Sequence, residues 1–220
     1  MEVLGINSSP RKRGNTARLL AAVLKGAEDG GCEVTDITLS DYEIRFCFGC
    51  EACYRTGSCV QSDDYADILE MILSSDGIVL ASPNYINNVT ARMKALFDRM
   101  GDCVHCQRMS GKYGAAVSTA GGSGAGDVAG YLNHTLSLMG ADMVGEASVN
   151  LSKGQDACNL AIKESHNLGM ALAEAIETGR VFPDQKAGHE EMMNRMRELV
   201  SLRSDDWAYE YAYFRAKKWL

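Results

Sequence analysis

The 220-residue sequence lacks a long hydrophobic run and lacks an excess of positive charge. No apolar stretch reaches the roughly 18 residues that a membrane-spanning helix needs, so we expect no membrane association. The chain starts Met1-Glu2-Val3, without a charged and then apolar leader, and we therefore expect no signal peptide. Its 29 acidic and 22 basic residues give a formal net charge of −7, which argues against nucleic acid as a partner.

Several catalytic signatures are missing as well. The sequence contains neither the G-x-G-x-x-G dinucleotide fingerprint nor the G-x-x-x-x-G-K-[ST] phosphate loop of ATPases. Its four histidines are scattered, and none stands in the order of a serine or cysteine hydrolase. We therefore predict no catalytic side chain of the acid–base or nucleophilic kind. Any reaction would then rely on a bound cofactor, for which the protein supplies placement and electrostatics.

Cysteine, in contrast, is plentiful, with eight residues. A cytoplasmic location is expected, where disulfides are rare and clustered thiols indicate metal or redox chemistry. Four of the cysteines crowd into one run and are expected to bind a metal centre together: Cys47, Cys50, Cys53 and Cys59. The C-x2-C-x2-C spacing is typical of iron–sulfur ligands. Because no second run exists, we predict that all four hold a single [4Fe–4S] cluster.

Two other interpretations of the cysteine run stay open. A zinc site also uses four cysteines, although zinc usually takes two C-x2-C pairs set farther apart. The run can also hold no metal. A second pair, Cys103 and Cys106 with His105 between them, is a redox pair, a ligand set or an incidental surface or interface feature. Cys32 and Cys158 are expected to be small core residues.

Apolar runs alternate with helix-like segments along most of the chain. We predict strands over residues 2–7, 33–39, 77–81, 113–118 and 143–149. Helices are predicted between and after them, over 17–27, a stretch headed by Asp63 and Asp64, 89–100, 128–139 and 157–178. This alternation predicts a parallel sheet with helices on both faces.

The first predicted strand leads into a polar loop, Asn7–Thr16. The loop offers hydroxyl groups, three cations and the backbone N–H groups at the start of a helix. A helix N-terminus carries a positive dipole, which suits a phosphate group. A basic surface turn with a helix cap is the other interpretation. The position after the first strand, where open α/β sheets bind ligands, favours phosphate binding.

Four motifs, taken in order, resemble those of the NADPH-dependent FMN reductase and iron–sulfur flavoprotein family. They are Ser9-Pro10-Arg11 with Gly14-Asn15-Thr16, Ser82-Pro83-Asn84-Tyr85, Lys94-Ala95-Leu96-Phe97-Asp98-Arg99 and Gly114-Ala115-Ala116-Val117-Ser118-Thr119-Ala120-Gly121-Gly122. The cysteine spacing resembles the compact motif of iron–sulfur flavoproteins. The resemblance covers roughly residues 1–180. It implies a flavodoxin-like α/β fold, with a doubly wound five-stranded parallel sheet in the order 2-1-3-4-5, and FMN as cofactor.

The resemblance also implies which residues contact FMN. Ser9, Arg11, Asn15 and Thr16 would hold the phosphate; Pro83, Asn84, Tyr85, Ile86 and Asn87 would border the isoalloxazine; and Thr119, Gly121 and Gly122 would form the other wall. The pair Asn87-Asn88 departs from relatives, which often have smaller residues there. For Tyr85, a core tyrosine is the alternative.

The function implied by this resemblance is electron transfer. A ferredoxin-like donor would reduce the cluster, the cluster would pass electrons to FMN, and the flavin would reduce a small-molecule acceptor. One alternative is an NAD(P)H-dependent FMN or quinone reductase without a working cluster. Another is a flavodoxin-type electron carrier. Family members are homodimers or homotetramers, and the same is expected of this chain.

Residues 1–180 are predicted to form the FMN-binding domain, with a cysteine-rich loop at 46–60. Residues 181–220 are predicted to be a helical appendage that follows a linker marked by Pro183 and Gly188. The aromatic end of this tail is a candidate for a subunit contact. The cysteine loop and the phosphate loop follow strands that neighbour each other in a 2-1-3-4-5 sheet. Both are therefore expected at the same edge, which puts the cluster on the flavin side, near a flavin of its own or a partner subunit.

Overall fold

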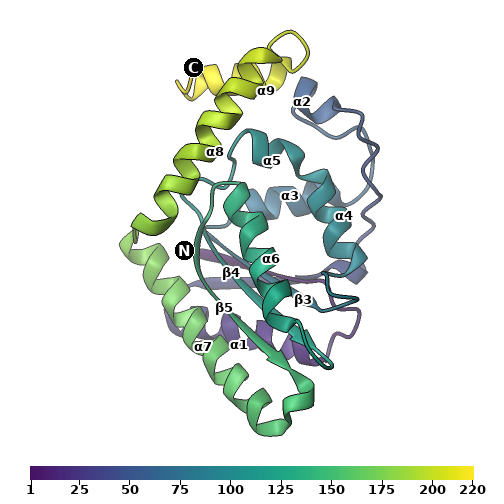
Figure 1. Ribbon diagram of the computed structural model, residues 1–220, viewed down its shortest axis with the longest axis vertical. Helices are drawn as coiled ribbons and strands as arrows, with labels where there is room; N and C mark the ends of the chain where they lie inside the picture. The colour runs from purple at the N-terminus through teal and green to yellow at the C-terminus, as the bar shows by residue number, and fades with distance from the viewer.

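The computed structural model describes residues 1–220, and a five-stranded parallel sheet organises it (Figure 1). Its strands are β1 (Glu2–Asn7), β2 (Glu33–Thr38), β3 (Gly77–Pro83), β4 (Tyr113–Ala120) and β5 (Asp142–Asn150). They lie in the order β2-β1-β3-β4-β5, and every neighbouring pair is parallel. The predicted flavodoxin-like topology is therefore confirmed.

Helices cover both faces of this sheet. The helices along the chain are α1 (Asn15–Asp29), α2 (Ala52–Thr56), α3 (Tyr65–Ser74), α4 (Ala91–Arg99), α5 (Gly101–His105), α6 (Ala125–Leu138), α7 (Gln155–Thr178), α8 (Pro183–Leu202) and α9 (Ala208–Ala216). Two single turns of 3-10 helix, Leu39–Asp41 and Leu151–Lys153, follow β2 and β5. No helix is both long and apolar enough to cross a membrane.

The core consists of two apolar layers, one on each face of the sheet. Side chains of α3, α4 and α6 pack on one face, and those of α1 and α7 pack on the other. The central strands β3 and β4 are almost wholly buried, which explains their continuous runs of small and apolar residues. At the α1–α7 crossing, a Cβ on Gly169 would collide with the carbonyl oxygen of Val23. Glycine is therefore required for this close helix approach.

The C-terminal forty residues differ from the sequence prediction. The linker predicted at Pro183 and Gly188 is wrong, because both residues belong to α8. Proline is favoured in the first turn of a helix, where its missing N–H has no intrahelical partner, so here it marks a helix start. We call residues 183–220 the C-terminal arm.

The arm is fastened to the edge of the sheet at its beginning. The Gln185 carboxamide accepts a hydrogen bond from the Met143 N–H and donates one to the Met143 carbonyl, both at 2.8 Å. From there α8 extends away from the sheet, and α9 ends beside α2 (Figure 1). The arm therefore joins the β5 edge to the cysteine loop.

Candidate cofactor sites

The phosphate loop, residues 8–14, is folded upon itself by short-range hydrogen bonds. The Ser9 N–H donates to Asn7 Oδ1 at 2.9 Å, the Arg11 N–H donates to Ser9 Oγ at 3.2 Å, and the Gly14 N–H donates to the Arg11 carbonyl at 2.8 Å. Gly14 is the N-cap of α1, and no side chain caps this helix. The first-turn N–H groups are therefore available to an anion.

The predicted FMN residues largely converge. A cavity of about 210 Å³ at the carboxyl ends of β1, β3 and β4 is lined by Ser9, Arg11, Gly14, Asn15, Thr16, Pro83, Asn84, Tyr85, Thr119, Ala120, Gly121 and Leu151. Across it, Thr16 Oγ1 lies 2.7 Å from Thr119 Oγ1. Three predicted residues, Ile86, Asn87 and Gly122, do not line it. Gly14, Ala120 and Leu151 line it as well, and sequence reasoning missed Leu151 because it follows β5, outside the four motifs.

Two features of this cavity suit a flavin. Asn84 Oδ1 is buried without a hydrogen-bond partner, although its Nδ2 donates to the Ser123 carbonyl at 2.8 Å. A buried acceptor without a partner costs free energy, so a donor on a bound molecule is expected there. A Cβ built on Gly121 or Gly122 would meet no atom within 4 Å, which leaves open space beside this backbone.

The turn at residues 85–88 carries backbone strain at the rim of the cavity. The Tyr85 N–H donates to the Asn88 carbonyl at 2.9 Å, and the Asn88 N–H donates back at 3.2 Å. Ile86 and Asn87 between them have φ values of 53° and 58°. The left-handed region is unfavourable for a β-branched residue, and Ile86 is also 98% exposed. Such strain is concentrated at ligand-binding sites.

The cysteine loop, residues 46–60, places its four thiols around a second cavity of about 200 Å³. Cys47 and Cys50 are exposed, and Cys53 and Cys59 are half-buried; none forms a disulfide. Burial, with a smaller contribution from Asp102, raises the pKa of Cys53 to about 12. No three His, Cys, Asp or Glu side chains lie close enough to hold one metal ion. Four cysteine thiols are a donor set that iron–sulfur clusters use and that zinc also uses, so the chemistry of this lining fits a metal centre of either kind.

A buried ion pair closes the base of the cysteine loop. Arg99 Nη1 and Nη2 donate to the two carboxylate oxygens of Asp63 at 2.8 and 3.1 Å, and their side chains are 1% and 0% exposed. Arg99 also donates to the Arg45 carbonyl at 3.1 Å, and Asp63 accepts the Arg45 N–H at 2.8 Å. The Arg99 guanidinium keeps the pKa of Asp63 below its usual value. The two ends of the loop are thus held together.

Sequence reasoning missed this pair. Asp63 was expected only at the start of a helix, and Arg99 only as the last residue of a family motif. Arg99 does not stand out in the sequence, because α4 also carries Arg92, Lys94 and Asp98. Only its position three residues after the buried Leu96 places Arg99 on the buried side of the helix.

The second cysteine pair belongs to the core. Cys103 and Cys106 are both fully buried, and they pack in two different apolar clusters. Burial raises the pKa of both thiols. Neither cysteine lines the cavity of the cysteine loop. The surface or interface interpretation of this pair is therefore wrong, because both cysteines are core residues.

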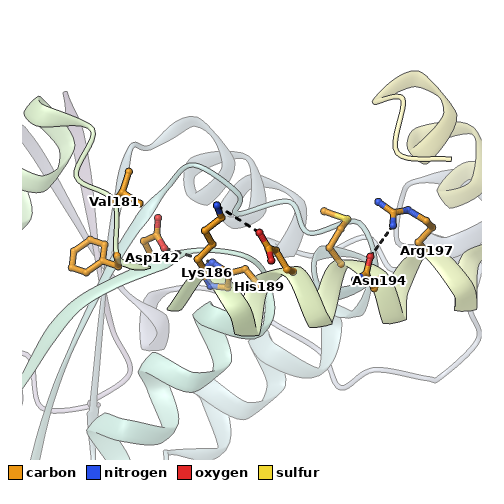
Figure 2. A pocket seen from close by; sticks show the side chains of 9 residues that line it. Asp142, Val181, Lys186, His189, Asn194 and Arg197 are labelled. Atoms are coloured by element: carbon orange, nitrogen blue, oxygen red, sulfur yellow. Dashed lines mark hydrogen bonds and ion pairs between the residues drawn. The ribbon is translucent and has the colours of Figure 1, made fainter. Parts of the chain in front are cut away.

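A third hollow, of about 500 Å³, lies along α8 (Figure 2). His189 lies between Asp142, at 3.6 Å, and Ser137, whose Oγ is 3.3 Å from His189 Nε2. Lys186 and Arg197 line the hollow as well, each paired on α8 with Glu190 or Asn194. None of the predicted cofactor residues lies there, so the hollow belongs to neither predicted site.

Comparison with known proteins identifies the family. The profile of the NADPH-dependent FMN reductase family matches residues 1–156. The chain belongs to the NADPH-dependent FMN reductase family. Within this oxidoreductase family it is related to iron–sulfur flavoproteins. It is 39% identical to one from Archaeoglobus fulgidus over 180 residues, which are 81% of each chain.

A second relative agrees with this placement in the family, and a solved structure shows the same fold. An iron–sulfur flavoprotein from Methanocaldococcus jannaschii is 30% identical over 189 residues, which are 80% of this chain and 98% of the relative. The solved structure of a flavodoxin from the domain Archaea has a TM-score of 0.56 at 18% identity, covering 80% of this chain and 99% of that one. FMN is implied for this FMN reductase family member, and an iron–sulfur cluster is implied by the names of its relatives.

Proposed function

We propose that this chain is an FMN-binding redox protein that also carries a [4Fe–4S] cluster and passes electrons from a ferredoxin-like donor to a small-molecule acceptor. The observation that carries the proposal is the presence of two separate cavities. Twelve residues around the phosphate loop line one, and all four thiols of the cysteine run line the other. FMN and the cluster supply the electron chemistry when bound, and the chain supplies their placement.

For FMN, the phosphate would bind at the start of α1. The first-turn N–H groups, Ser9 and Thr16 would donate hydrogen bonds, and Arg11 would pair with its charge. Asn84 Oδ1 offers an acceptor for the ring. Ile86, Asn87 and Gly122 keep their proposed place beside the ring, outside the cavity wall.

For the cluster, the four ligands would be Cys47, Cys50, Cys53 and Cys59. The thiols must lose their protons to bind iron, and the neutral state favoured at Cys53 means that binding releases a proton there. Arg99 lines the same cavity and would balance part of the negative charge of the bound cluster and its ligands.

Counting cofactors tests the proposal directly. Protein purified without oxygen should contain iron and acid-labile sulfide in near-equal amounts and FMN close to one per chain. Cys59→Ser should lose the iron and sulfide but keep its FMN. It should also lose reduction by reduced ferredoxin and keep reduction by dithionite. The matched control is Cys158→Ser on α7, which should keep both cofactors. Zinc without sulfide in the wild type, or full iron in Cys59→Ser, would contradict the proposal.

A second candidate is a reductase that takes electrons from NAD(P)H, and the family supports it. The chain has no dinucleotide fingerprint, so nicotinamide would have to bind transiently over the flavin. Stopped-flow reduction distinguishes the two: our proposal requires reduced ferredoxin to be the faster donor. Rapid reduction by NADPH of the cluster-loaded protein would favour the reductase.

A homodimer or homotetramer is part of the proposal. Large apolar side chains are exposed on the cysteine loop, at Phe46 and Phe48, and on the turn at the flavin rim, at Ile86. Exposed apolar surface of this kind is typical of regions that another chain covers. Sedimentation equilibrium measures the assembly, and a monomer at micromolar concentration would contradict this part.

A further inference from the structure

The tip of the C-terminal arm is hydrogen-bonded to the cysteine loop. Trp207 Nε1–H donates to Glu51 Oε2 at 3.0 Å, and Arg203 Nη2 lies 3.5 Å from the same oxygen. Glu51 stands between two predicted ligands, Cys50 and Cys53. It is the N-cap of α2 and has a left-handed backbone with φ of 57°. A residue in this conformation needs outside contacts to hold it there.

Aromatic packing strengthens the same contact. Trp207, only 6% exposed, stacks on His105 with ring centres 4.9 Å apart. It also meets the ring of Tyr54, from α2, edge-on at 4.9 Å. His105 Nδ1 in turn lies 3.1 Å from both carboxylate oxygens of the fully buried Glu210. Tyr54, which directly follows Cys53, thus packs against both His105 of α5 and Trp207 of the arm.

A third contact lies at the other end of α2. Gly57 ends this helix with φ of 77°, and a Cβ there would collide with the ring of Tyr209. Trp207 and Tyr209 therefore contact the two residues that cap α2, Glu51 at its start and Gly57 at its end. Each of these contacts of the arm joins positions about 100 to 160 apart in the chain, and none uses a predicted metal ligand.

We propose that Trp207, through Glu51, is a positioning residue for the cluster, and that the C-terminal arm is part of the cluster site. This inference rests on the proposed function, since it concerns the same four cysteines. Residues that orient metal ligands without binding the metal commonly change metal affinity ten- to a hundred-fold when replaced. A short five-residue helix is not stable alone, so α2 needs the arm to fix Cys50 and Cys53.

Iron release measures this role. Trp207→Phe keeps an aromatic ring but has no N–H to donate, and Glu51→Ala removes the acceptor on a partly exposed side chain. In cluster-loaded protein, both should release iron to a chelator about tenfold faster than wild type. Glu51→Gln keeps an acceptor and should restore the wild-type rate. The matched control is Trp219→Phe, because Trp219 follows α9 and its ring packs against Phe214 and Tyr213.

Two further measurements separate positioning from general destabilisation. The electron paramagnetic resonance spectrum of the reduced cluster should change in Trp207→Phe and Glu51→Ala, while the FMN content stays at the wild-type value. Hydrogen exchange of residues 52–57 should be about tenfold faster in both variants after removal of the cluster.

The outcomes are distinct. If wild-type protein holds no iron and sulfide, the proposed function fails and the positioning role fails with it. If wild type holds the cluster but Trp207→Phe and Glu51→Ala release iron at the wild-type rate with an unchanged spectrum, only the positioning role is overturned. A Trp219→Phe variant that releases iron as fast as Trp207→Phe would also overturn it.

Discussion

The phosphate loop and the cysteine loop are held by contacts of different range. Hydrogen bonds within the phosphate loop join residues two or three positions apart, such as Ser9 with Asn7. The cysteine loop is closed by Asp63 with Arg99, 36 positions apart, and by Glu51 with Trp207, 156 positions apart. The first loop is therefore shaped largely by its own residues, and the Ser8 N–H attaches it to the Ala81 carbonyl on β3. The second depends on the completed fold.

This difference predicts where the protein is most sensitive to substitution. Arg99→Met leaves the Asp63 carboxylate buried without its partner, and we expect the free energy of unfolding to fall by about 3–5 kcal/mol. Urea unfolding followed by circular dichroism measures the loss. Adding Asp63→Asn removes the uncompensated charge and should recover most of it. A loss below about 1 kcal/mol in Arg99→Met would mean that the ion pair does not close the loop.

Substitutions in and beside the phosphate loop should change the affinity for FMN and leave the stability of the fold unchanged. Thr16→Val keeps the shape of the side chain but removes the hydroxyl that lies beside Thr119, so affinity for FMN should fall by roughly ten- to a hundred-fold. Fluorescence titration measures this, and iron content should not change. The control is Thr35→Val, on the exposed side of β2. Equal FMN affinity in Thr16→Val and wild type would show that Thr16 does not bind the phosphate.

Relieving the strain in the turn at residues 85–88 tests whether this backbone conformation lowers the stability of the protein. Ile86→Asn places a residue that tolerates the left-handed region at φ of 53°, and the free energy of unfolding should rise by about 1 kcal/mol. Val181→Asn, at an exposed apolar position without positive φ, is the control and should show no gain. Thermal denaturation of the wild type and both variants without FMN measures the gain, and equal stability of Ile86→Asn and wild type would show that the turn is not strained.

The smallest expected effect is a pH dependence beside the cysteine loop. Burial raises the pKa of Glu210 above its ordinary value of 4.5, although the hydrogen bond with His105 acts in the opposite direction. Above pH 4.5 the unfolded state gives up a proton that the folded state still holds. Stability therefore falls as pH rises from 4.5 to the raised pKa.

Glu210→Gln should remove this part of the slope. Urea midpoints at several pH values between 4.5 and 8 measure it, with Glu174→Gln on an exposed position of α7 as the control. If stability depends on pH in the same way in Glu210→Gln and in wild type, a group other than Glu210 is responsible for the pH dependence.

The fold and one of the two sites were largely predictable from the sequence. Apolar strands alternating with helices gave the parallel sheet, and the position of Ser9 and Thr16 around the first strand's end indicated the cavity in which they now lie together. Such signals are local, because the residues that indicate a buried strand or the start of a helix are adjacent in the sequence.

The supports of the cysteine loop were not predictable in the same way. Nothing near Asp63 indicates Arg99, and nothing near Glu51 indicates Trp207, because their pairing follows from the tertiary fold alone. The aromatic tail stays a candidate for a subunit contact, and its Trp207 and Tyr209 pack against the chain's own cysteine loop. The oligomeric state itself stays a prediction.

The pairing of the Gln185 carboxamide with the Met143 backbone has a practical consequence for shortening the chain. An edge strand offers unpaired backbone groups to any other strand that approaches, and Gln185 occupies two of them at the start of β5. Removing residues 181–220 would uncover that edge. The same truncation would also remove the contacts of Trp207 and Tyr209 with the cysteine loop. A minimal version of this protein for engineering therefore has to keep the arm, although the sheet and its apolar layers lie wholly before it.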